Sequence, residues 1–160
     1  MLLQQRTVLA RDCAGRRGGG DDHGSGVGGG AESGGGDGDG KVGGMDTFPD
    51  FMRHPANRIA QTNQATPGVE GYVFDGADGS QMAFWTCRET AVSQTHAHDY
   101  DEYMVVVEGC YTLTINGERI PVKAGEEYLI PRGVAHGGEV LAGTRTIHTF
   151  GGHRADRVRA

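Results

Sequence analysis

The stretches THAHDYDE at residues 95–102 and PRGVAH at residues 131–136 decide the fold of this chain. Side chains two residues apart in a β-strand leave the same face, with a rise of about 6.6 Å between them. His96 and His98 can therefore converge on one ion, and Glu102 stays on that face if residues 99–101 only bend the strand. We expect one ribbon to supply these three ligands. His136 would be the fourth ligand, from a separate strand that reaches the site only if the sheet curls over, as in a small barrel.

The two stretches resemble the paired motifs of the cupin superfamily. The first motif, Gly-x5-His-x-His-x3,4-Glu-x6-Gly, is matched by His96, His98, Glu102 and Gly109, with Thr90 in place of the leading glycine. The second motif, Gly-x5-Pro-x-Gly-x2-His-x3-Asn, is matched by Gly125, Pro131, Gly133 and His136, with Val140 in place of the Asn. The resemblance covers residues 70–150. It implies an all-β fold, the antiparallel double-stranded β-helix of the cupin or jelly-roll barrel, holding a metal ion.

The metal prediction competes with a simpler interpretation of each residue. A single strand histidine is more often a hydrogen-bonded surface or core residue than a ligand. Four ligand-type residues at the family spacing favour a site for one divalent ion, and three imidazoles with a carboxylate suit Fe, Mn, Ni, Zn or Cu. An octahedral ion would keep two open positions for Lewis-acid or oxygen chemistry. A tetrahedral zinc would be closed by the same ligands and would be structural.

An ion with open positions and a closed structural ion imply two different functions. We favour a metal-dependent enzyme of the dioxygenase, isomerase or lyase type, acting on a small oxygenated metabolite that chelates the ion. The alternative is a non-catalytic sensor or binding module for a small ligand, with a structural metal. Enzyme chemistry needs a proton-transfer group, and His148, Tyr100 and Tyr103 are the candidates, although His148 also fits a hydrogen-bonded core residue. Arg145 lies at an odd offset from His148, so only one of the two can face the site.

Short segments rich in β-branched and aromatic residues recur every 8–12 residues between residues 66 and 150, without a long amphipathic helix. The pair Asn116-Gly117 between alternating apolar residues is the strongest short hairpin signal. This pattern favours an antiparallel sandwich or barrel. Strands are expected at 72–74, 81–86, 103–107, 111–115, 119–122, 126–130 and 144–150, besides those that carry the ligands.

Composition divides the chain at Met45. Residues 1–44 hold 16 of the 29 glycines and are expected to be a disordered leader, with Met45 as the hypothetical natural start. An irregular arm with one short helical turn is expected at 45–65, the barrel at 66–152 and a solvated, flexible tail at 153–160. The apolar residues of the arm around Phe48, Phe51 and Ile59 favour a homodimer, and the resemblance implies the same, because cupins of this size are commonly dimers.

Charge, hydropathy and cysteine content limit the classes of partner that this chain can bind. The formal charge of −6 comes without a concentrated basic face, which argues against nucleic acid, and no apolar run is long enough for a membrane span. The three cysteines show no Cys-x-x-Cys spacing. We expect Cys87 and Cys110 to be buried free thiols in a cytoplasmic protein, with a small molecule as the partner of the site.

Overall fold

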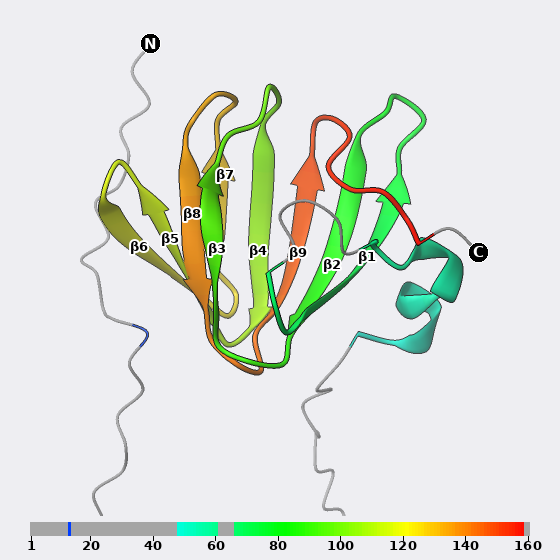
Figure 1. Ribbon diagram of the computed structural model, residues 1–160, viewed down its shortest axis with the longest axis horizontal. Coiled ribbons are helices and arrows are strands. Elements are labelled where there is room, and N and C mark those ends of the chain that lie inside the picture. The colour runs from blue at the N-terminus through cyan, green and yellow to red at the C-terminus, as the bar shows by residue number, and fades with distance from the viewer. Residues whose placement is uncertain (1–12, 14–47, 61–65, 159–160) are drawn as a thin grey trace, which may run out of the picture. The chain divides into compact units, whose positions relative to one another are not determined.

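Nine strands form two antiparallel sheets in the computed structural model, which describes residue 13 and residues 48–60 and 66–158 (Figure 1). The five-stranded sheet has the order β1-β2-β9-β4-β7, and the four-stranded sheet has the order β3-β8-β5-β6. The expected all-β cupin barrel is therefore confirmed. The strands are β1 Val69–Asp75, β2 Gln81–Cys87, β3 Ala91–His96, β4 Glu102–Glu108, β5 Cys110–Ile115, β6 Glu118–Lys123, β7 Glu127–Ile130, β8 His136–Val140 and β9 Arg145–Phe150.

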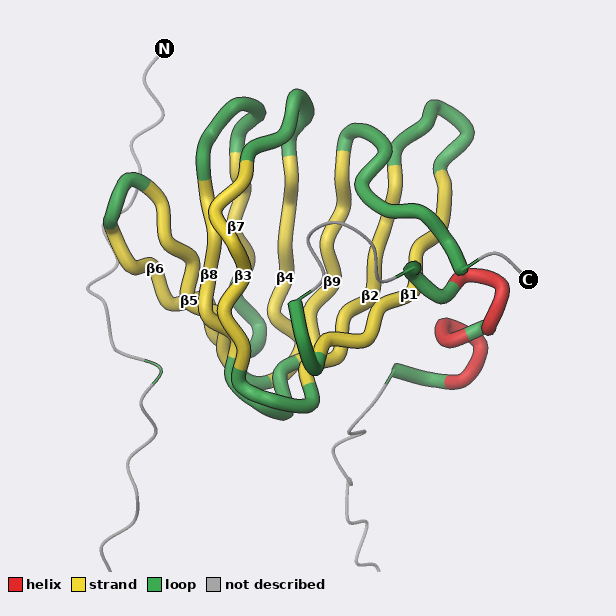
Figure 2. Tube along the Cα trace, in the orientation of Figure 1, coloured by secondary structure: helices red, strands yellow, loops and turns green. Residues whose placement is uncertain are grey.

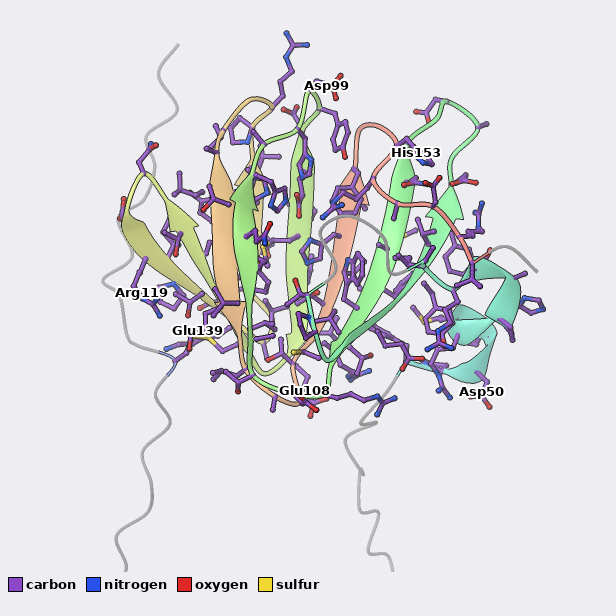
Figure 3. The ribbon with its side chains drawn as sticks, in the orientation of Figure 1. Asp50, Asp99, Glu108, Arg119, Glu139 and His153 are labelled. Atoms are coloured by element: carbon purple, nitrogen blue, oxygen red, sulfur yellow. A yellow bond between two sulfur atoms is a disulfide. The ribbon has the colours of Figure 1, made fainter. Side chains whose placement is uncertain are left out.

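The core lies between the two sheets. Met104 and Val106 of β4 and Ile130 of β7 come from the larger sheet, and Leu113 of β5 and Val122 of β6 come from the smaller one. All five are almost fully buried. Because each strand turns alternate side chains inward, the two sheets together enclose an apolar layer, and Figure 3 shows side chains filling the space between them.

Tight turns at positive φ hold the strands in register. Asn116 and Gly117 have φ values of 51° and 80°, and Ile115 pairs with Glu118 across the hairpin between β5 and β6. This geometry confirms the predicted Asn-Gly hairpin. Gly109, between β4 and β5, has a φ of 79°, and a Cβ there would lie 2.8 Å from the Cα of Thr144.

The segment that carries three of the predicted ligands is not a single ribbon. Strand β3 ends at His96, and β4 begins at Glu102 in the other sheet. The intervening loop is fixed because Gly133 donates a backbone hydrogen bond to the His98 carbonyl, at 2.7 Å, and Asp101 accepts one from the Arg132 N–H, at 2.8 Å. The chain thus crosses between sheets within the first motif, which the expectation of one bent strand missed.

The C-terminal segment packs along the barrel rather than extending into solvent (Figure 2). The side-chain oxygen of Gln81 accepts hydrogen bonds from the backbone N–H groups of Arg154, at 2.6 Å, and Ala155, at 2.9 Å. Ala60 donates to the Asp156 carbonyl at 2.8 Å, which pairs the segment with the arm. The solvated tail expected from residue 153 is therefore corrected for residues 153–156.

The arm contains two short 3-10 turns, η1 Asp50–Arg53 and η2 Pro55–Asn57. Phe48 is buried against Phe84 on the outer face of β2, whereas Phe51 is 79% exposed. Neither helical turn of the described residues is long and apolar enough to cross a membrane. Residues 45–47 and 61–65 of the predicted arm lie outside the described part of the chain.

The cysteines differ from expectation at one position. Cys110 forms a disulfide with Cys13, so it is not the free thiol that its apolar setting suggested. The sequence pattern missed this pairing because the two residues are 97 positions apart. Cys87 is buried and free, as expected. The predicted disorder of the leader concerns residues outside the described part, apart from Cys13.

Candidate metal centre

Four side chains gather at one end of the barrel with ligand atoms within 4.8 Å of one another: His96, His98, Glu102 and His136. His96 ends β3 and His136 begins β8, and the two are direct partners in the ladder between these strands. His98 lies in the loop after β3, and Glu102 begins β4. The structure thus brings together the four predicted ligands from both sheets, at the end where Figure 3 labels Asp99.

The histidine rings are oriented for an ion. The Nδ1 of His96 lies 2.8 Å from the Gln94 carbonyl, and the Nδ1 of His136 lies 2.9 Å from the Val134 carbonyl. Because a carbonyl only accepts, each Nδ1 carries the proton and each Nε2 keeps a lone pair. The Nε2 of His136 is buried without a hydrogen bond. Such an orphaned nitrogen beside a carboxylate fits a divalent metal ion.

Glu102 supplies the negative charge of the cluster. It is 5% exposed, and its Oε2 lies 3.0 Å from His98 Nε2 and 3.3 Å from His136 Nε2. Burial raises the pKa of Glu102, but the adjacent imidazoles of His136, His148 and His98 outweigh burial and hold that pKa far below its usual range. The group is therefore a carboxylate, the form that binds a metal ion.

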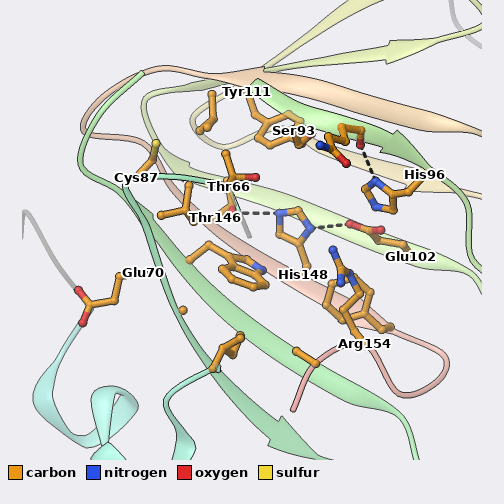
Figure 4. A pocket seen from close by; sticks show the side chains of 18 of the residues that line it. Thr66, Glu70, Cys87, Ser93, His96, Glu102, Tyr111, Thr146, His148 and Arg154 are labelled. Atoms are coloured by element: carbon orange, nitrogen blue, oxygen red, sulfur yellow. Dashed lines mark hydrogen bonds and ion pairs between the residues drawn. The ribbon is translucent and has the colours of Figure 1, made fainter. Parts of the chain in front are cut away.

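His148 lies directly behind Glu102, with both ring nitrogens engaged (Figure 4). Its Nδ1 lies 2.6 Å from Glu102 Oε1, and its Nε2 lies 2.9 Å from Thr146 Oγ1. Since Glu102 is a carboxylate and only accepts, His148 donates from Nδ1. Arg145 instead contacts Glu108 and the ring of Phe48, so His148 is the one that faces the interior, as the odd offset predicted.

The two candidate tyrosines occupy different places. Tyr100 stacks on the His98 ring with centroids 4.8 Å apart, and burial raises the pKa of its phenol. Tyr103 is 40% exposed and points to the opposite face of β4 from Glu102, so its position does not support the predicted catalytic role.

A cavity of about 370 Å³ runs from the cluster into the barrel. His96, Glu102 and His136 line one end, and Arg154 lies beside them (Figure 4). Arg154 was missed because the tail was expected to be solvated. Its position depends on Gln81, some 70 residues earlier, which holds the backbone of the segment, and no local pattern signals that contact.

Comparison with known proteins agrees with this architecture. The family model described as a cupin domain matches residues 83–146. Over these residues the chain carries a cupin domain. A curated relative, the pectin degradation protein KdgF of Dickeya dadantii, is 29% identical over 91 residues, which are 56% of this chain and 83% of the relative.

Two solved structures share the fold. KdgF from Halomonas sp. has a TM-score of 0.55 at 20% identity, covering 68% of this cupin and 94% of its own chain. The polyketide cyclase RemF from Streptomyces resistomycificus has a TM-score of 0.53 at 20% identity, covering 66% of this cupin and 81% of its own chain.

The departures from the cupin motifs leave the ligands in place. Gly125 and Gly133 adopt positive φ values of 84° and 80°, as motif glycines at turns. Thr90, which replaces the leading glycine, accepts a hydrogen bond from the Ala142 N–H at 3.1 Å. Val140, which replaces the Asn, is buried and pairs with Ala91. Both substitutions lie away from the four-residue cluster and serve the opposite end of the strands.

Proposed function

We propose that this cupin is a metal-dependent enzyme that acts on a small oxygenated carboxylic acid, held to the ion by two of its oxygens. The observation that carries the proposal is a cationic side chain, Arg154, beside the buried cluster inside a cavity of about 370 Å³. The curated relative is a pectin degradation protein, which supports an enzymatic role.

Arg154 is placed to bind an anion. Within the described part of the chain, its guanidinium has no carboxylate partner and lies 5.8 Å from the centroid of the Phe150 ring. It is close enough to the cluster to act on it: burial lowers the pKa of His96, and the charge of Arg154 acts in the same direction. An arginine without an acidic partner in a cavity is suited to a ligand carboxylate, which it can bind through two parallel hydrogen bonds.

The ligand set would be His96, His98, Glu102 and His136, and Fe, Mn, Ni, Zn or Cu each suit it. When bound, the ion supplies Lewis-acid or oxygen-activating chemistry. The chain's own residues orient the acid through Arg154 and exclude water through the barrel walls. His148 is the proposed proton-transfer group nearest the cavity, and Tyr100 is the second.

A non-catalytic binding or sensor module is the second candidate, and one observation favours it. Both ring nitrogens of His148 are engaged, one by Glu102 and one by Thr146. A histidine fixed in this way holds the carboxylate and has no nitrogen left for a substrate proton. In that case the metal and Arg154 would retain an acid without changing it.

The test separates binding from turnover. Protein purified without added metal is analysed for bound metals, then loaded with Co²⁺ and titrated with lactate, a 2-hydroxy acid. We expect a shift of the cobalt absorption bands that is weakened in Arg154→Leu. Proton spectra of candidate hydroxy and oxo acids after incubation with the native metal form then show conversion if it is an enzyme. Binding without conversion of any such acid would favour the sensor, and no band shift at all would refute both.

A further inference from the structure

The cavity extends well beyond the space that a two- or three-carbon acid needs at the cluster. In the larger sheet, Glu102 is in register with Phe150, and Trp85 is in register with Thr146. Phe150 and Thr146 are four residues apart on β9, which is about 13 Å along a strand. Both Trp85 and Thr146 line the cavity. The cavity therefore continues past the cluster to the depth of Trp85 and Thr146, which we call its second level.

Two aromatic side chains from opposite sheets line this second level. Trp85 comes from β2 of the five-stranded sheet, and Tyr111 comes from β5 of the four-stranded sheet. We name the part of the cavity between Trp85 and Tyr111 the inner slot; Figure 4 labels Tyr111 on its wall.

A glycine makes room for each ring. Gly71 is the cross-strand partner of Trp85, and a Cβ at Gly71 would collide with the indole ring. A Cβ at Gly138 would lie 2.7 Å from Cζ of Tyr111. Because two separate strands each leave out a side chain at these rings, the width of the slot depends on both glycines.

The polar side chains of Thr146, Tyr111 and Ser93, which line the cavity at the inner slot, are already bonded within the protein. Thr146 Oγ1 pairs with His148 Nε2, and the hydroxyl of Tyr111 lies 3.4 Å from Ser93 Oγ. Ser93 Oγ also accepts a hydrogen bond from the Gly138 N–H at 2.9 Å. Cys87, at the far end of the cavity, donates to the Glu89 carbonyl at 2.6 Å.

This arrangement selects against a hydroxyl-rich ligand. A ligand hydroxyl placed beside these bonded groups would lose its water without gaining a free partner from them, which is unfavourable. An apolar ring has no such requirement and gains from burial against two aromatic side chains.

We propose that the inner slot binds an aromatic or similarly flat apolar ring of the ligand, between Trp85 and Tyr111. Together with the proposed function, on which this inference rests, it makes the ligand class an aryl-substituted 2-hydroxy or 2-oxo acid. The acid group lies at the cluster and Arg154, and the ring lies at the second level. A polyhydroxylated acid of similar length is disfavoured.

The test compares three acids with the same 2-hydroxy carboxylate head: lactate, 3-phenyllactate and gluconate. Each is titrated into the full-length, Co²⁺-loaded protein, and binding is followed by the cobalt absorption bands. We expect 3-phenyllactate to bind at least about tenfold more tightly than lactate, as burial of a phenyl ring provides. Gluconate should bind no more tightly than lactate.

Two variants test whether the tighter binding of 3-phenyllactate arises in the inner slot. Trp85→Leu removes one aromatic wall, and Gly138→Ala pushes the Tyr111 ring inward. In each variant the affinity for 3-phenyllactate should fall close to the affinity of the same variant for lactate. Met82→Ala is the matched control, because Met82 lies on the same strand as Trp85 but faces outward. The wild-type series stands without the variants if either of them fails to fold.

The outcomes are distinguishable. Equal binding of lactate and 3-phenyllactate overturns the inner slot and leaves the proposed function in place. Tighter binding of gluconate than of 3-phenyllactate also overturns it, and indicates a polar pocket. Failure of all three acids to shift the cobalt bands refutes the proposed function, and this inference with it.

Discussion

His96 and His136 face each other across the ladder of β3 and β8, with ring centroids 4.4 Å apart. Each ring donates from Nδ1 to a carbonyl two residues before it, Gln94 for one and Val134 for the other. The two imidazoles are thus oriented by the same kind of hydrogen bond on neighbouring strands, and the Nε2 of His136 lies 3.3 Å from Glu102 Oε2. Rings oriented by strand backbone in this way are pre-organised to bind a metal ion.

Metal content tests the ligand set directly. Replacing His96 and His98 together by Ala removes two imidazoles and should leave the purified protein with almost no bound transition metal, measured by elemental analysis. His54→Ala is the matched control, because His54 is an exposed arm residue outside the cluster. Full metal occupancy in the double variant would show that the ion binds elsewhere.

His148 should tune metal affinity through Glu102. The His148–Glu102 hydrogen bond, at 2.6 Å, holds the carboxylate in place, so His148→Ala should weaken metal binding by roughly 10- to 100-fold. Competition with a chromophoric chelator measures this without any activity assay. Thr146→Val, which removes only the partner of the other nitrogen, should have a smaller effect in the same direction. Unchanged affinity in His148→Ala would contradict the positioning role.

Arg154 should control the affinity for acids. Arg154→Leu removes the cation beside the cluster and should weaken lactate binding by about tenfold or more, the cost of one charged hydrogen bond. Arg154→Lys should recover part of the loss, because a point charge replaces the planar fork. The control is Arg132→Leu, an exposed arginine in the turn before β8. Equal losses in the Arg154 and Arg132 variants would mean a general charge effect.

Two motif glycines should differ in their contribution to stability. Gly109→Ala meets both a positive φ and the backbone of Thr144, so we expect a loss of about 3 kcal/mol in the free energy of unfolding. Gly125→Ala has a similar φ but no atom within 4 Å of the added Cβ, so about 1 kcal/mol is expected. Urea denaturation measures both. Similar losses would show that the contact with Thr144 is readily relieved.

Exposed apolar residues on the outer face of the larger sheet favour a homodimer. Met82, Tyr103 and Leu129 lie in one row across the strands and are 39%, 40% and 51% exposed. Thr149 separates Met82 from Tyr103 in this row, and exposed apolar side chains gathered on one face of a sheet often lie at an interface. We expect a dimer by light scattering at micromolar concentration, converted to a monomer by Leu129→Glu. Phe51→Glu, on the exposed arm, is the control. A monomeric wild-type protein would refute this prediction.

Much of the architecture follows from local pattern. The Asn116-Gly117 hairpin, the strands around it and the alternation that buries Met104 and Val106 are all visible in the order of residues, because a strand period of two and a turn at positive φ are local properties. Local spacing also indicated His96, His98 and Glu102 as candidate ligands, and the resemblance to the two cupin motifs added His136. Tyr103 shows the limit of this approach, since proximity to Glu102 in sequence placed it near the site and the alternation of β4 turns it away.

The sequence by itself determined the strands, the turns and the identity of the four candidate ligands, since strands and turns depend on spacing over a few residues and the ligands lie in two short motifs. Only the tertiary structure decided that the ligands come from two sheets, that His148 holds Glu102, and that Arg154 reaches the cavity. These features depend on pairings such as Gln81 with residues 154–155 and Trp85 with Thr146, made between segments more than 60 residues apart. Such contacts form because the folded barrel brings distant backbone groups together, and no local propensity encodes them.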